Sequence, residues 1–550
     1  MAKNFRPLDY QAKLDLSKII VKNPPRHDDQ VPMDVLFVGA GPAGLAGAIE
    51  LAKLVKEDNE KGGNIGDVEI GVLEKAESLG GHNLSGAVIN PRALKELFPS
   101  LNEKDFPFRG QVKGDRFYKL GEQGMMRMPA PPTMNNHGNY VASICEVVRW
   151  MGEKAEEMGV NIFTSFPADT LMMENDHVIG VRTAPMGLNR DGSQGEQFMP
   201  GTEVTANVTV LTEGTRGLLT QAYLQESKIS SKYPQIYALG VKEVWKVKKA
   251  PEYVTHTLGW PLPDSAFGGS WMYPMGEDMI SLGLVVGLDY KEHNLDVHKL
   301  LQKMKQHPLF SEYLEGGECL EWGAKTIPEG GLNALPETLH GNGLLIAGDC
   351  AGFVNVPALK GIHYAMQTGI YAARTAFKAL KEKNYNAGIL SHYDKLVKES
   401  YVWSDLKKVR NMRQAFKAGF VAGGIKAGLM TLTGGAFPGD SQGYEEDAAE
   451  EKTVNSTALV EDTGLSKVDA VYMSSNKTRD DIPSHLTIGT DIPPEVAEFY
   501  VNMCPAGVYE KQGDKLVVNA PNCIDCKATD VLGPRWQPRE GGAGPSYRLM

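Results

Sequence analysis

The sequence predicts an α/β fold with α+β parts, divided among several subdomains. A chain of 550 residues is too long for one small hydrophobic core. Residues 34–56 run from a short apolar strand pattern through a glycine-rich loop into a helical stretch. Two further apolar strand patterns, at residues 208–214 and 344–349, also reach a glycine. Three of the six cysteines lie within the last 50 residues, which favours a cofactor site there.

The composition excludes several classes of protein. The formal net charge of -11 argues against nucleic acid as a partner, because phosphate binding requires a basic surface. Six cysteines are too few for a disulfide framework and indicate a reducing compartment. The first residues contain no apolar signal segment, and no uncharged apolar run is long enough to predict a spanning helix.

The glycine-rich loop predicts a dinucleotide site in a Rossmann-like domain. Its glycines are spaced G-x-G-x-x-G between a strand and a helix, which is the context that this motif requires. Gly39 permits the tight turn, Gly41 lets a pyrophosphate approach the backbone, and Gly44 lets helix and strand pack closely. A second strand ends at Glu74, whose carboxylate is placed to accept hydrogen bonds from ribose hydroxyls. A glycine-rich turn in an unrelated α/β domain would leave Glu74 unexplained.

Later glycine-bearing segments favour FAD over NAD. One buried strand ends at Gly214, and another is closed by Gly348 and Asp349. The Asp349 carboxylate can hydrogen-bond a ribityl hydroxyl, and the alternative role is a helix N-cap. The loop from Asn355 to Gly361 is then expected to pass the flavin ring. Since a second G-x-G-x-x-G is not evident, electrons are expected to arrive from a protein.

At this point the chain resembles the electron-transfer flavoprotein:ubiquinone oxidoreductase family. The resemblance runs from about Asp34 to Met550 through VGAGPAGLA, LEKAESLGGHNLSGAVINPRALKELFP, MNNHGNY, NVPALKGIHYAM, CPAGVYE and EGGAGPSY. It implies a glutathione-reductase-type FAD domain, a quinone-binding domain with a β-sheet and a C-terminal ferredoxin-like iron–sulfur domain. It also implies an electron-transferring-flavoprotein dehydrogenase, in which electrons enter from reduced electron-transfer flavoprotein and leave to quinone.

The same resemblance implies further FAD contacts and a location. Lys75, Ser85 and Gly86 fall in the matching stretch and would join the FAD contacts. The protein would be monotopic, on the cytoplasmic face of a bacterial inner membrane or on the mitochondrial inner membrane.

The C-terminal cysteines predict an iron–sulfur site in which one ligand position is changed. Cys504 and the pair Cys523 and Cys526 can share one cluster. In the family a fourth cysteine extends the motif to C-x-x-C-x-x-C, and here that position is Thr529. Four outcomes are open. Water or an oxygen ligand such as Asp530 completes a [4Fe–4S] cube, the site holds [3Fe–4S], the cluster is lost, or the cysteines and one further ligand hold zinc.

Residues 401–437 predict a helical segment at a membrane surface. Apolar bulk recurs there at roughly helical spacing among basic side chains, which suits a helix lying in the lipid interface. The alternative is an amphipathic helix packed on the core, and the glycines allow a helix–loop–helix. The apolar set is Phe416, Phe420, Val421, Ile425, Leu429 and Met430, and the basic set is Lys407, Lys408, Arg410, Arg413, Lys417 and Lys426. The family resemblance adds residues 85–99 as a second membrane-contacting segment.

Two smaller motifs have a structural and a functional interpretation. Gly268 and Gly269 lie among aromatic and apolar residues, where the residues alone predict a tight hairpin turn. The resemblance implies instead that this pair contacts the quinone head. His137 is expected to be a turn residue rather than a catalytic group.

The expected domains are discontinuous. They are an FAD domain at 1–130, 195–225 and 335–400, a quinone-binding domain at 131–194 and 226–334, the membrane segment at 401–437, a solvated acidic linker at 438–490 and the iron–sulfur domain at 491–550. Two other functions stay open: an FAD-dependent reductase or hydroxylase of a small apolar molecule, and a membrane-docking subunit of a larger electron-transfer complex.

Overall fold

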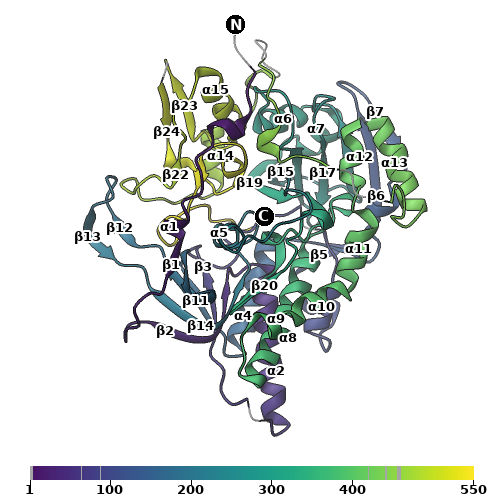
Figure 1. Ribbon diagram of the computed structural model, residues 1–550. Coiled ribbons are helices and arrows are strands. Elements are labelled where there is room, and N and C mark those ends of the chain that lie inside the picture. The colour runs from purple at the N-terminus through teal and green to yellow at the C-terminus, as the bar shows by residue number, and fades with distance from the viewer. Residues whose placement is uncertain are drawn as a thin grey trace.

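The computed structural model arranges the chain as two large sheets and a small C-terminal domain (Figure 1). It describes residues 4–63, 65–86, 88–418, 420–439, 443–454, 460–513 and 515–550, and within these ranges the side chains of Ala418, Phe420 and Val421 are not described.

The larger sheet carries the predicted glycine-loop motif. Its strands follow the order β1-β10-β11-β14-β2-β3-β9, with β21 beside β14 and β20 beside β21. β2 pairs in parallel with β14 and with β3, and α2 makes the crossover between β2 and β3. The inner strand residues 35–38 are buried, as expected for a parallel strand with both faces covered. The bounds are β1 Ile20–Lys22, β2 Val31–Val38, α2 Pro42–Glu60, β3 Ile70–Glu74, α4 Ile144–Glu156, β9 Asn161–Thr164, β10 Ala168–Glu174, β11 His177–Thr183, β14 Glu203–Leu211, α5 Leu218–Glu226, β20 His340–Gly341, β21 Leu344–Ile346 and α8 Ile362–Glu382.

The second sheet lies at the upper right of Figure 1 and is mainly antiparallel. Its order is β19-β15-β18-β17-β16-β6-β7, and helices α6 and α7 follow β18 in the chain. A smaller sheet consists of β4, β8 and β5, and a β12–β13 hairpin projects at the left of Figure 1, between β11 and β14 in the chain. The bounds are β4 Val88–Ile89, α3 Arg92–Leu97, β5 Phe108–Gln111, β6 Asp115–Leu120, β7 Met125–Met128, β8 Tyr140–Ala142, β12 Met186–Leu188, β13 Gln194–Met199, β15 Tyr237–Lys246, β16 Val254–Gly259, β17 Gly268–Pro274, β18 Met279–Gly287, α6 Val297–Met304, α7 Pro308–Leu314 and β19 Glu318–Pro328.

The C-terminal domain packs its cysteine loop on the second sheet. The Thr326 N–H on β19 donates to the Cys526 carbonyl at 2.9 Å, and α14 contacts β19. Two short ladders, β22–β25 and β23–β24, flank the loop. The bounds are α14 Lys467–Met473, β22 Leu486–Thr487, α15 Pro494–Met503, β23 Tyr509–Gln512, β24 Lys515–Val518, α16 Ala528–Leu532 and β25 Arg535–Trp536.

Two predicted domain boundaries are wrong. Residues 131–194 were assigned to the quinone-binding domain, yet β9, β10 and β11 belong to the nine-stranded sheet. Residues 1–130 were assigned to the FAD domain, yet β6 and β7 belong to the second sheet. Short alternating strands have the same pattern in either sheet, so their pairing is decided by contacts between segments far apart in the chain.

The segment expected at the membrane is a series of short helices: α11 Tyr401–Val409, α12 Met412–Ala415, a 3-10 turn Phe416–Ala418 and α13 Phe420–Leu432. None of the helices within the described residues combines the length and apolar character needed to cross a bilayer. The acidic stretch that follows is less solvated than predicted, because Asp447 and Lys452 are buried. Asp447 accepts a hydrogen bond from the Tyr237 N–H at 2.7 Å, which ties this stretch to the second sheet.

Candidate functional site

Gly39 and Gly44 fit the two backbone roles predicted for them. Gly39 has φ +114°, and a Cβ there would lie 2.5 Å from the Thr212 carbonyl oxygen. A Cβ at Gly44 would lie 2.0 Å from the Gly39 carbonyl oxygen. The turn and the close approach of α2 to β2 therefore both require glycine.

Gly41 and Gly214 leave space where a ligand would approach the backbone. The atom nearest to a Cβ at Gly41 is Asn83 Nδ2 at 3.6 Å, and at Gly214 no described atom lies within 4 Å. Gly41 is also the N-cap of α2, with no side chain capping the helix. The free N–H groups of the first turn thus lie at an open cradle that suits a pyrophosphate.

Glu74 lies at the end of β3, beside this cradle. Its carboxylate accepts hydrogen bonds from the Ala40 N–H at 3.1 Å and the Ala76 N–H at 2.8 Å. These bonds fix the carboxylate at the cavity wall, and it has lone pairs left for ribose hydroxyls.

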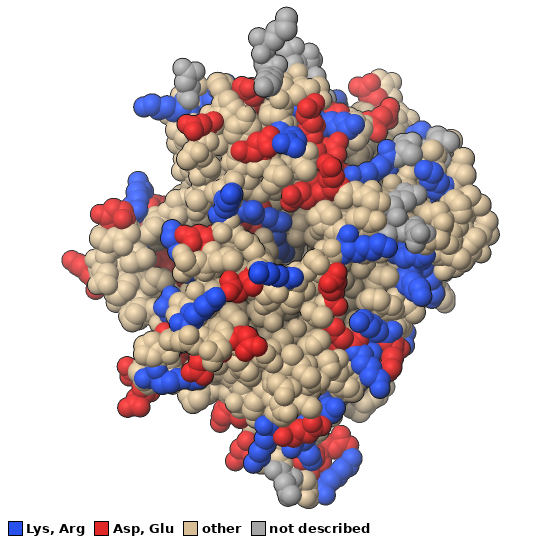
Figure 2. All heavy atoms as spheres, in the orientation of Figure 1, with Lys and Arg blue, Asp and Glu red and all other residues tan. Residues whose placement is uncertain are grey.

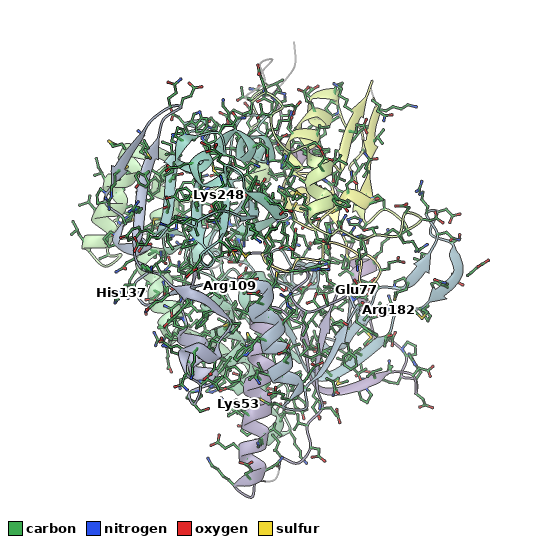
Figure 3. The ribbon with its side chains drawn as sticks, turned by 180° about the vertical axis from the view of Figure 1, so that it is seen from behind. Lys53, Glu77, Arg109, His137, Arg182 and Lys248 are labelled. Atoms are coloured by element: carbon green, nitrogen blue, oxygen red, sulfur yellow. The ribbon has the colours of Figure 1, made fainter. Side chains whose placement is uncertain are left out.

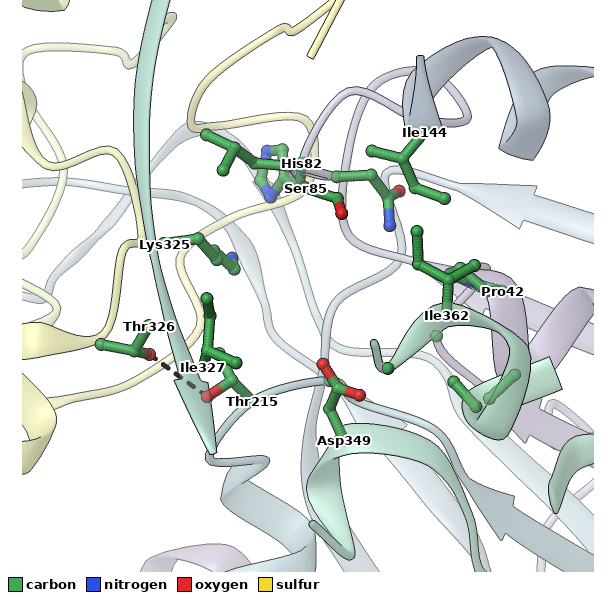
Figure 4. Close-up of a pocket in the computed structure, with 18 of the residues that line it drawn as sticks. Pro42, His82, Ser85, Ile144, Thr215, Lys325, Thr326, Ile327, Asp349 and Ile362 are labelled. Carbon is green, nitrogen blue, oxygen red and sulfur yellow. Dashed lines mark hydrogen bonds between the residues drawn. The ribbon is translucent and has the colours of Figure 1, made fainter. Parts of the chain in front are cut away.

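The cradle opens into a cavity that is lined by residues of both sheets (Figure 4). The cavity holds about 2210 Å³ of empty space including its mouth. The expected contacts that line it are Gly39, Gly41, Glu74, Lys75, Ser85, Gly86, Gly214, Asp349 and Gly361. Its position at the carboxyl ends of parallel strands suits a dinucleotide.

Three expected FAD contacts, Gly44, Gly348 and Asn355, lie behind the cavity wall and do not line the cavity. Gly44 packs helix on strand, and a Cβ at Gly348 would meet the Ala43 Cβ at 3.0 Å. Asn355 is buried, its Oδ1 accepts from the Ala358 N–H at 3.1 Å, and its Nδ2 lies 3.4 Å from the Tyr364 hydroxyl. The prediction that Asn355 contacts the flavin is therefore not supported, because both ends of its amide hold the loop together.

Asp349 points into the cavity, as Figure 4 shows. Burial raises the pKa of this carboxyl to about 6, although Lys325 opposes the shift. The short helical turn that begins at Gly348 has Ala347 as its N-cap, so the alternative role as a helix cap does not apply.

Several basic groups of the cavity were missed in the sequence: His82, Lys325, Lys360, His363 and Lys527. Burial lowers the pKa of Lys325 and of Lys360 to about 8 in each case. Both ring nitrogens of His82 are buried, and no described residue hydrogen-bonds to them. The Asp525 carboxylate lies 3.7 Å from Nδ1, too far for a hydrogen bond, so this buried imidazole can still bind a polar group of a cofactor in the cavity. Among these groups, only Lys325 could have been noticed in the sequence, because it is a lysine inside an apolar strand pattern.

The three C-terminal cysteines are brought together in one buried pocket. Cys504 follows α15, and Cys523 and Cys526 flank a turn. The phenol of Tyr509 lies near all three thiols and interacts with them electrostatically. Burial raises the pKa of the Cys523 thiol to about 12, so the thiolate form in this pocket requires a cation. Nearby, both nitrogens of buried His485 lack a partner among described residues, which fits a polyatomic cluster with acceptor sulfurs.

The fourth ligand position differs from the four-cysteine pattern in a specific way. The Thr529 hydroxyl lies 2.5 Å from the Tyr509 hydroxyl and 3.3 Å from the Pro534 carbonyl oxygen. Asp530, the oxygen ligand considered above, is engaged elsewhere. Its carboxylate pairs with Arg216 at 2.6 Å and accepts from the Trp536 N–H at 3.2 Å. Three thiols therefore fit a cluster, and the contacts of Asp530 do not favour it as the fourth ligand.

The cavity and the cysteine pocket share a wall built on Asp525. Its carboxylate pairs with Lys75 at 2.7 Å and with Arg539 at 2.8 Å, and accepts from the Trp536 indole at 3.0 Å. Cys523 Sγ lies 3.8 Å away. Burial would raise the pKa of Asp525, but Arg539 and Lys75 outweigh burial and hold it well below its usual range. Because Lys75 lines the cavity, one anionic side chain touches both sites.

Gly268 and Gly269 begin strand β17, so the predicted hairpin turn is wrong. A Cβ at Gly268 would lie 2.1 Å from the Val285 carbonyl oxygen, and one at Gly269 would lie 2.4 Å from the Thr257 carbonyl oxygen. Both glycines are thus required by strand pairing. The preceding Phe267 ring packs on Phe416 at 5.7 Å, which joins this strand to the helices of residues 401–437.

Apolar side chains project at the edge of the molecule formed by α13 and β7. Ile425 is 63% exposed, Leu432 84% and Met126 58%, and Leu429 and Met125 are also exposed. In Figures 1 and 3, α13 and the β6–β7 hairpin occupy the same edge, and Figure 2 shows tan surface there bordered by Lys and Arg. The second exposed element is therefore the β6–β7 hairpin. Residues 85–99 do not supply it, because Ala93, Leu94 and Leu97 are buried.

Part of the predicted basic set has a structural role. Arg413 is buried and pairs with Glu329 at 2.7 Å and Asp289 at 2.8 Å. Arg410 donates to the Gly435 carbonyl at 2.6 Å and the Gly439 carbonyl at 2.8 Å. The lysines of the set remain at the surface or partly so, and the predicted side-chain roles of Phe420 and Val421 lie outside the described side chains.

His137 is an exposed turn residue, as predicted. Its N–H donates to the Asn135 side-chain oxygen at 2.9 Å, and Figure 3 shows it at the periphery of the molecule. The other cysteines, Cys145, Cys319 and Cys350, are free and buried or half-buried.

Two segments of the chain match known families. Residues 237–327 match "ETF-QO, ubiquinone-binding", and residues 463–548 match "Electron transfer flavoprotein-ubiquinone oxidoreductase, 4Fe-4S". The first covers the second sheet from β15 to β19, and the second covers the cysteine-bearing domain.

Relatives align over nearly the whole chain. The mitochondrial electron transfer flavoprotein-ubiquinone oxidoreductase of Oryza sativa is 38% identical, over 94% of this chain and 93% of that protein. The mitochondrial protein of the same name from Bos taurus is 37% identical, over 94% of this chain and 89% of its own length.

Solved structures share the fold at low sequence identity. A geranylgeranyl bacteriochlorophyll reductase-like protein from Thermoplasma acidophilum superposes with a TM-score of 0.56 at 20% identity, covering 75% of this chain and 93% of that one. The flavin-dependent brominase Bmp2 gives 0.50 at 17% identity, covering 74% and 94%.

Proposed function

The chain belongs to the electron transfer flavoprotein-ubiquinone oxidoreductase family, and we propose on that basis that it passes electrons from reduced electron-transfer flavoprotein through FAD and an iron–sulfur cluster to quinone. The observation that carries the proposal is the shared wall. A dinucleotide cavity and a three-cysteine pocket meet at Lys75 and Asp525, whose side chains are 2.7 Å apart. Two redox groups held against one wall suit electron relay and have no role in a hydroxylase.

Residues at the cavity wall would hold FAD in an extended form. Gly41 and the first turn of α2 would receive the pyrophosphate, Glu74 the ribose hydroxyls and Asp349 the ribityl chain. His82, Lys325 and Lys360 would border the rest of the cofactor. Flavin exchanges one or two electrons and the cluster one at a time, which matches a donor that delivers single electrons to a quinone that takes two.

The quinone is proposed to enter between α12–α13 and β17. Phe267 and Phe416 join these elements, and the Trp260 N–H donates to the Leu120 carbonyl of the β6–β7 hairpin at 3.2 Å. Gly268 and Gly269 lie at the start of β17, on the same side. These contacts place the proposed entry between the apolar edge and the sheet that borders the cavity.

The apolar edge is proposed to lie in the membrane interface, which makes the protein monotopic. The relatives named above are mitochondrial proteins. We place this chain on the inner membrane of a mitochondrion, or on the cytoplasmic face of the inner membrane if the source is bacterial. The domains in this scheme are the nine-stranded sheet for FAD, the seven-stranded sheet for quinone and residues 463–548 for the cluster.

Electron transfer is tested with full-length protein in quinone-containing vesicles. Reduced electron-transfer flavoprotein should drive rapid quinol formation, and reduced nicotinamides should not. Cys523→Ser should suppress the rate, whereas the matched variant Cys319→Ser, outside the cysteine pocket, should not. A rate with nicotinamide equal to that with the flavoprotein would instead indicate a reductase of small molecules.

Membrane binding is tested by vesicle flotation. Replacing Leu429 and Leu432 by Glu should release the protein from vesicles, because two exposed apolar side chains leave the lipid boundary. The matched control is Val468→Glu with Tyr472→Glu, a pair on α14 that is more exposed than Leu429 and Leu432. Equal binding by both double variants would contradict the assignment of this edge.

A further inference from the structure

The cysteine pocket differs from a four-cysteine site at one corner, and the structure shows what occupies that corner. Tyr509 lies near all three thiols, and its hydroxyl is 2.5 Å from the Thr529 hydroxyl. Thr529 is the residue at the fourth position of the C-x-x-C-x-x-C pattern. A pair of hydroxyl groups therefore lies where a thiolate would complete the ligand set.

The Thr529 hydroxyl is poorly suited to bind iron. It donates its proton to the Pro534 carbonyl oxygen at 3.3 Å, so the Tyr509 hydroxyl is the donor in the bond between the two side chains. A hydroxyl that keeps its proton and also accepts a hydrogen bond is neutral, whereas the irons of such clusters are held by thiolates. Binding iron would require loss of the proton and of both hydrogen bonds in a buried pocket.

Solvent and neighbouring carboxylates do not fill the same corner. Thr529 is 7% exposed and Tyr509 is 3% exposed, so bulk water does not reach this pair. Asp530 is paired with Arg216, and Asp525 with Lys75 and Arg539. Among the residues that the structure describes, no carboxylate thus remains for a fourth iron at this corner.

His485 is the remaining group to consider. Its ring nitrogen, Cys523 Sγ and a carboxylate oxygen of Asp525 all lie within 4.8 Å of one another. That spacing places His485 beside the Cys523 corner. A histidine there can donate a hydrogen bond to a cluster or thiolate sulfur, while the Thr529 corner stays without a ligand.

We infer that the pocket holds a three-iron [3Fe–4S] cluster through Cys504, Cys523 and Cys526, with the Tyr509–Thr529 hydroxyl pair closing the fourth corner. The inference rests on the proposed function, because that function places an iron–sulfur cluster in this pocket. Three thiolates match the three irons, and the buried Tyr509–Thr529 hydroxyl pair lies at the position of the missing cysteine.

The test is the iron content and electron paramagnetic resonance of full-length protein purified without oxygen. The expected result is about three irons per chain and a signal in the oxidised form that disappears on one-electron reduction. The variant Thr529→Cys is expected to hold about four irons and to give its signal only after reduction. Thr529→Ser keeps the hydroxyl and serves as the matched control, with three irons retained.

Several outcomes would overturn the inference. They are about four irons in the anaerobic wild-type protein, no iron at all, or an unchanged three-iron signal in Thr529→Cys. Four irons that depend on His485, shown by their loss in His485→Ala, would assign that residue as the fourth ligand. Flavin absorbance reports whether each variant folds. Quinol formation from reduced electron-transfer flavoprotein, measured on the same samples, tests the proposed function separately from the number of irons.

Discussion

Arg413 provides the sharpest test of how the helices of residues 401–432 are attached to the protein. Its guanidinium is 3% exposed, pairs with Glu329 at 2.7 Å and Asp289 at 2.8 Å, and lies 3.9 Å from the Phe267 ring centroid. Arg413→Met keeps the apolar stem but leaves buried Glu329 without a counter-charge and Asp289 with only the more distant Lys417, at 3.9 Å. Removing one partner of a buried ion pair typically costs about 3–5 kcal/mol of unfolding free energy, so we expect a loss of that size.

The loss should depend on pH, and its direction follows from the two carboxyl groups. Burial favours a raised pKa for both carboxyl groups. In Asp289, the Arg413 charge outweighs burial and holds the pKa below its usual value. In Glu329, burial prevails and the pKa stays raised. Without Arg413 both pKa values rise. The folded variant then binds more protons than the unfolded chain, so its stability falls as pH rises through the raised pKa values. The deficit relative to wild type should be smaller near about pH 5 than near about pH 8.

The assay is urea unfolding followed by tryptophan fluorescence at both pH values. Glu329→Gln in the Arg413→Met background should recover part of the loss, because one uncompensated charge is removed. Arg410→Met is the matched control in the same segment. Its guanidinium bonds only to backbone carbonyls among the described residues, so a loss of about 1 kcal/mol is expected. An Arg413→Met loss below about 1 kcal/mol, or an equal loss at both pH values, would refute the reasoning.

Three further predictions concern the cofactor sites. Gly44→Val should yield protein without bound FAD, because a Cβ at this position would lie 2.0 Å from the Gly39 carbonyl oxygen. Flavin absorbance measures the bound FAD. The control Gly424→Val, on an open face of α13, should retain FAD. FAD affinity should weaken as pH falls through about 6, where Asp349 takes up a proton and loses acceptor capacity, and titration of Asp349→Asn should show a flat profile. Asp525→Asn should raise the reduction potential of the cluster, because a negative charge 3.8 Å from Cys523 Sγ is removed, and redox titration of Glu77→Gln, an exposed acid, should show no change.

The local parts of the fold and site could be predicted from the sequence. The glycine loop was predictable because strand, turn and helix are adjacent, and each glycine has a steric reason that the structure confirms at Gly39 and Gly44. The helix at residues 144–156 and the strand at 279–287 follow from hydrophobic periodicity in the same way.

The remaining features depend on contacts between distant segments. Lys75 and Asp525 are 450 positions apart, and no local sequence pattern predicts that they pair. In the sequence, Arg413 cannot be distinguished from the lysines around it. Only the folded structure shows that it pairs with two carboxylates, those of Asp289 and Glu329. The methionines of β7 likewise have the sequence pattern of an ordinary strand. Their exposure could not be predicted, because it depends on which segments pack against the strand.

The shared wall also bears on how the protein is assembled in the cell. Lys527, Trp536 and Pro538 form part of the FAD cavity, and Lys75 obtains its buried counter-charge from Asp525. A growing chain presents the glycine loop long before these residues have been synthesised, so early-bound flavin would meet a cavity open on one side. Because these residues belong to the last part of the chain to be synthesised, the cavity wall is complete only after the cysteine-bearing domain has docked.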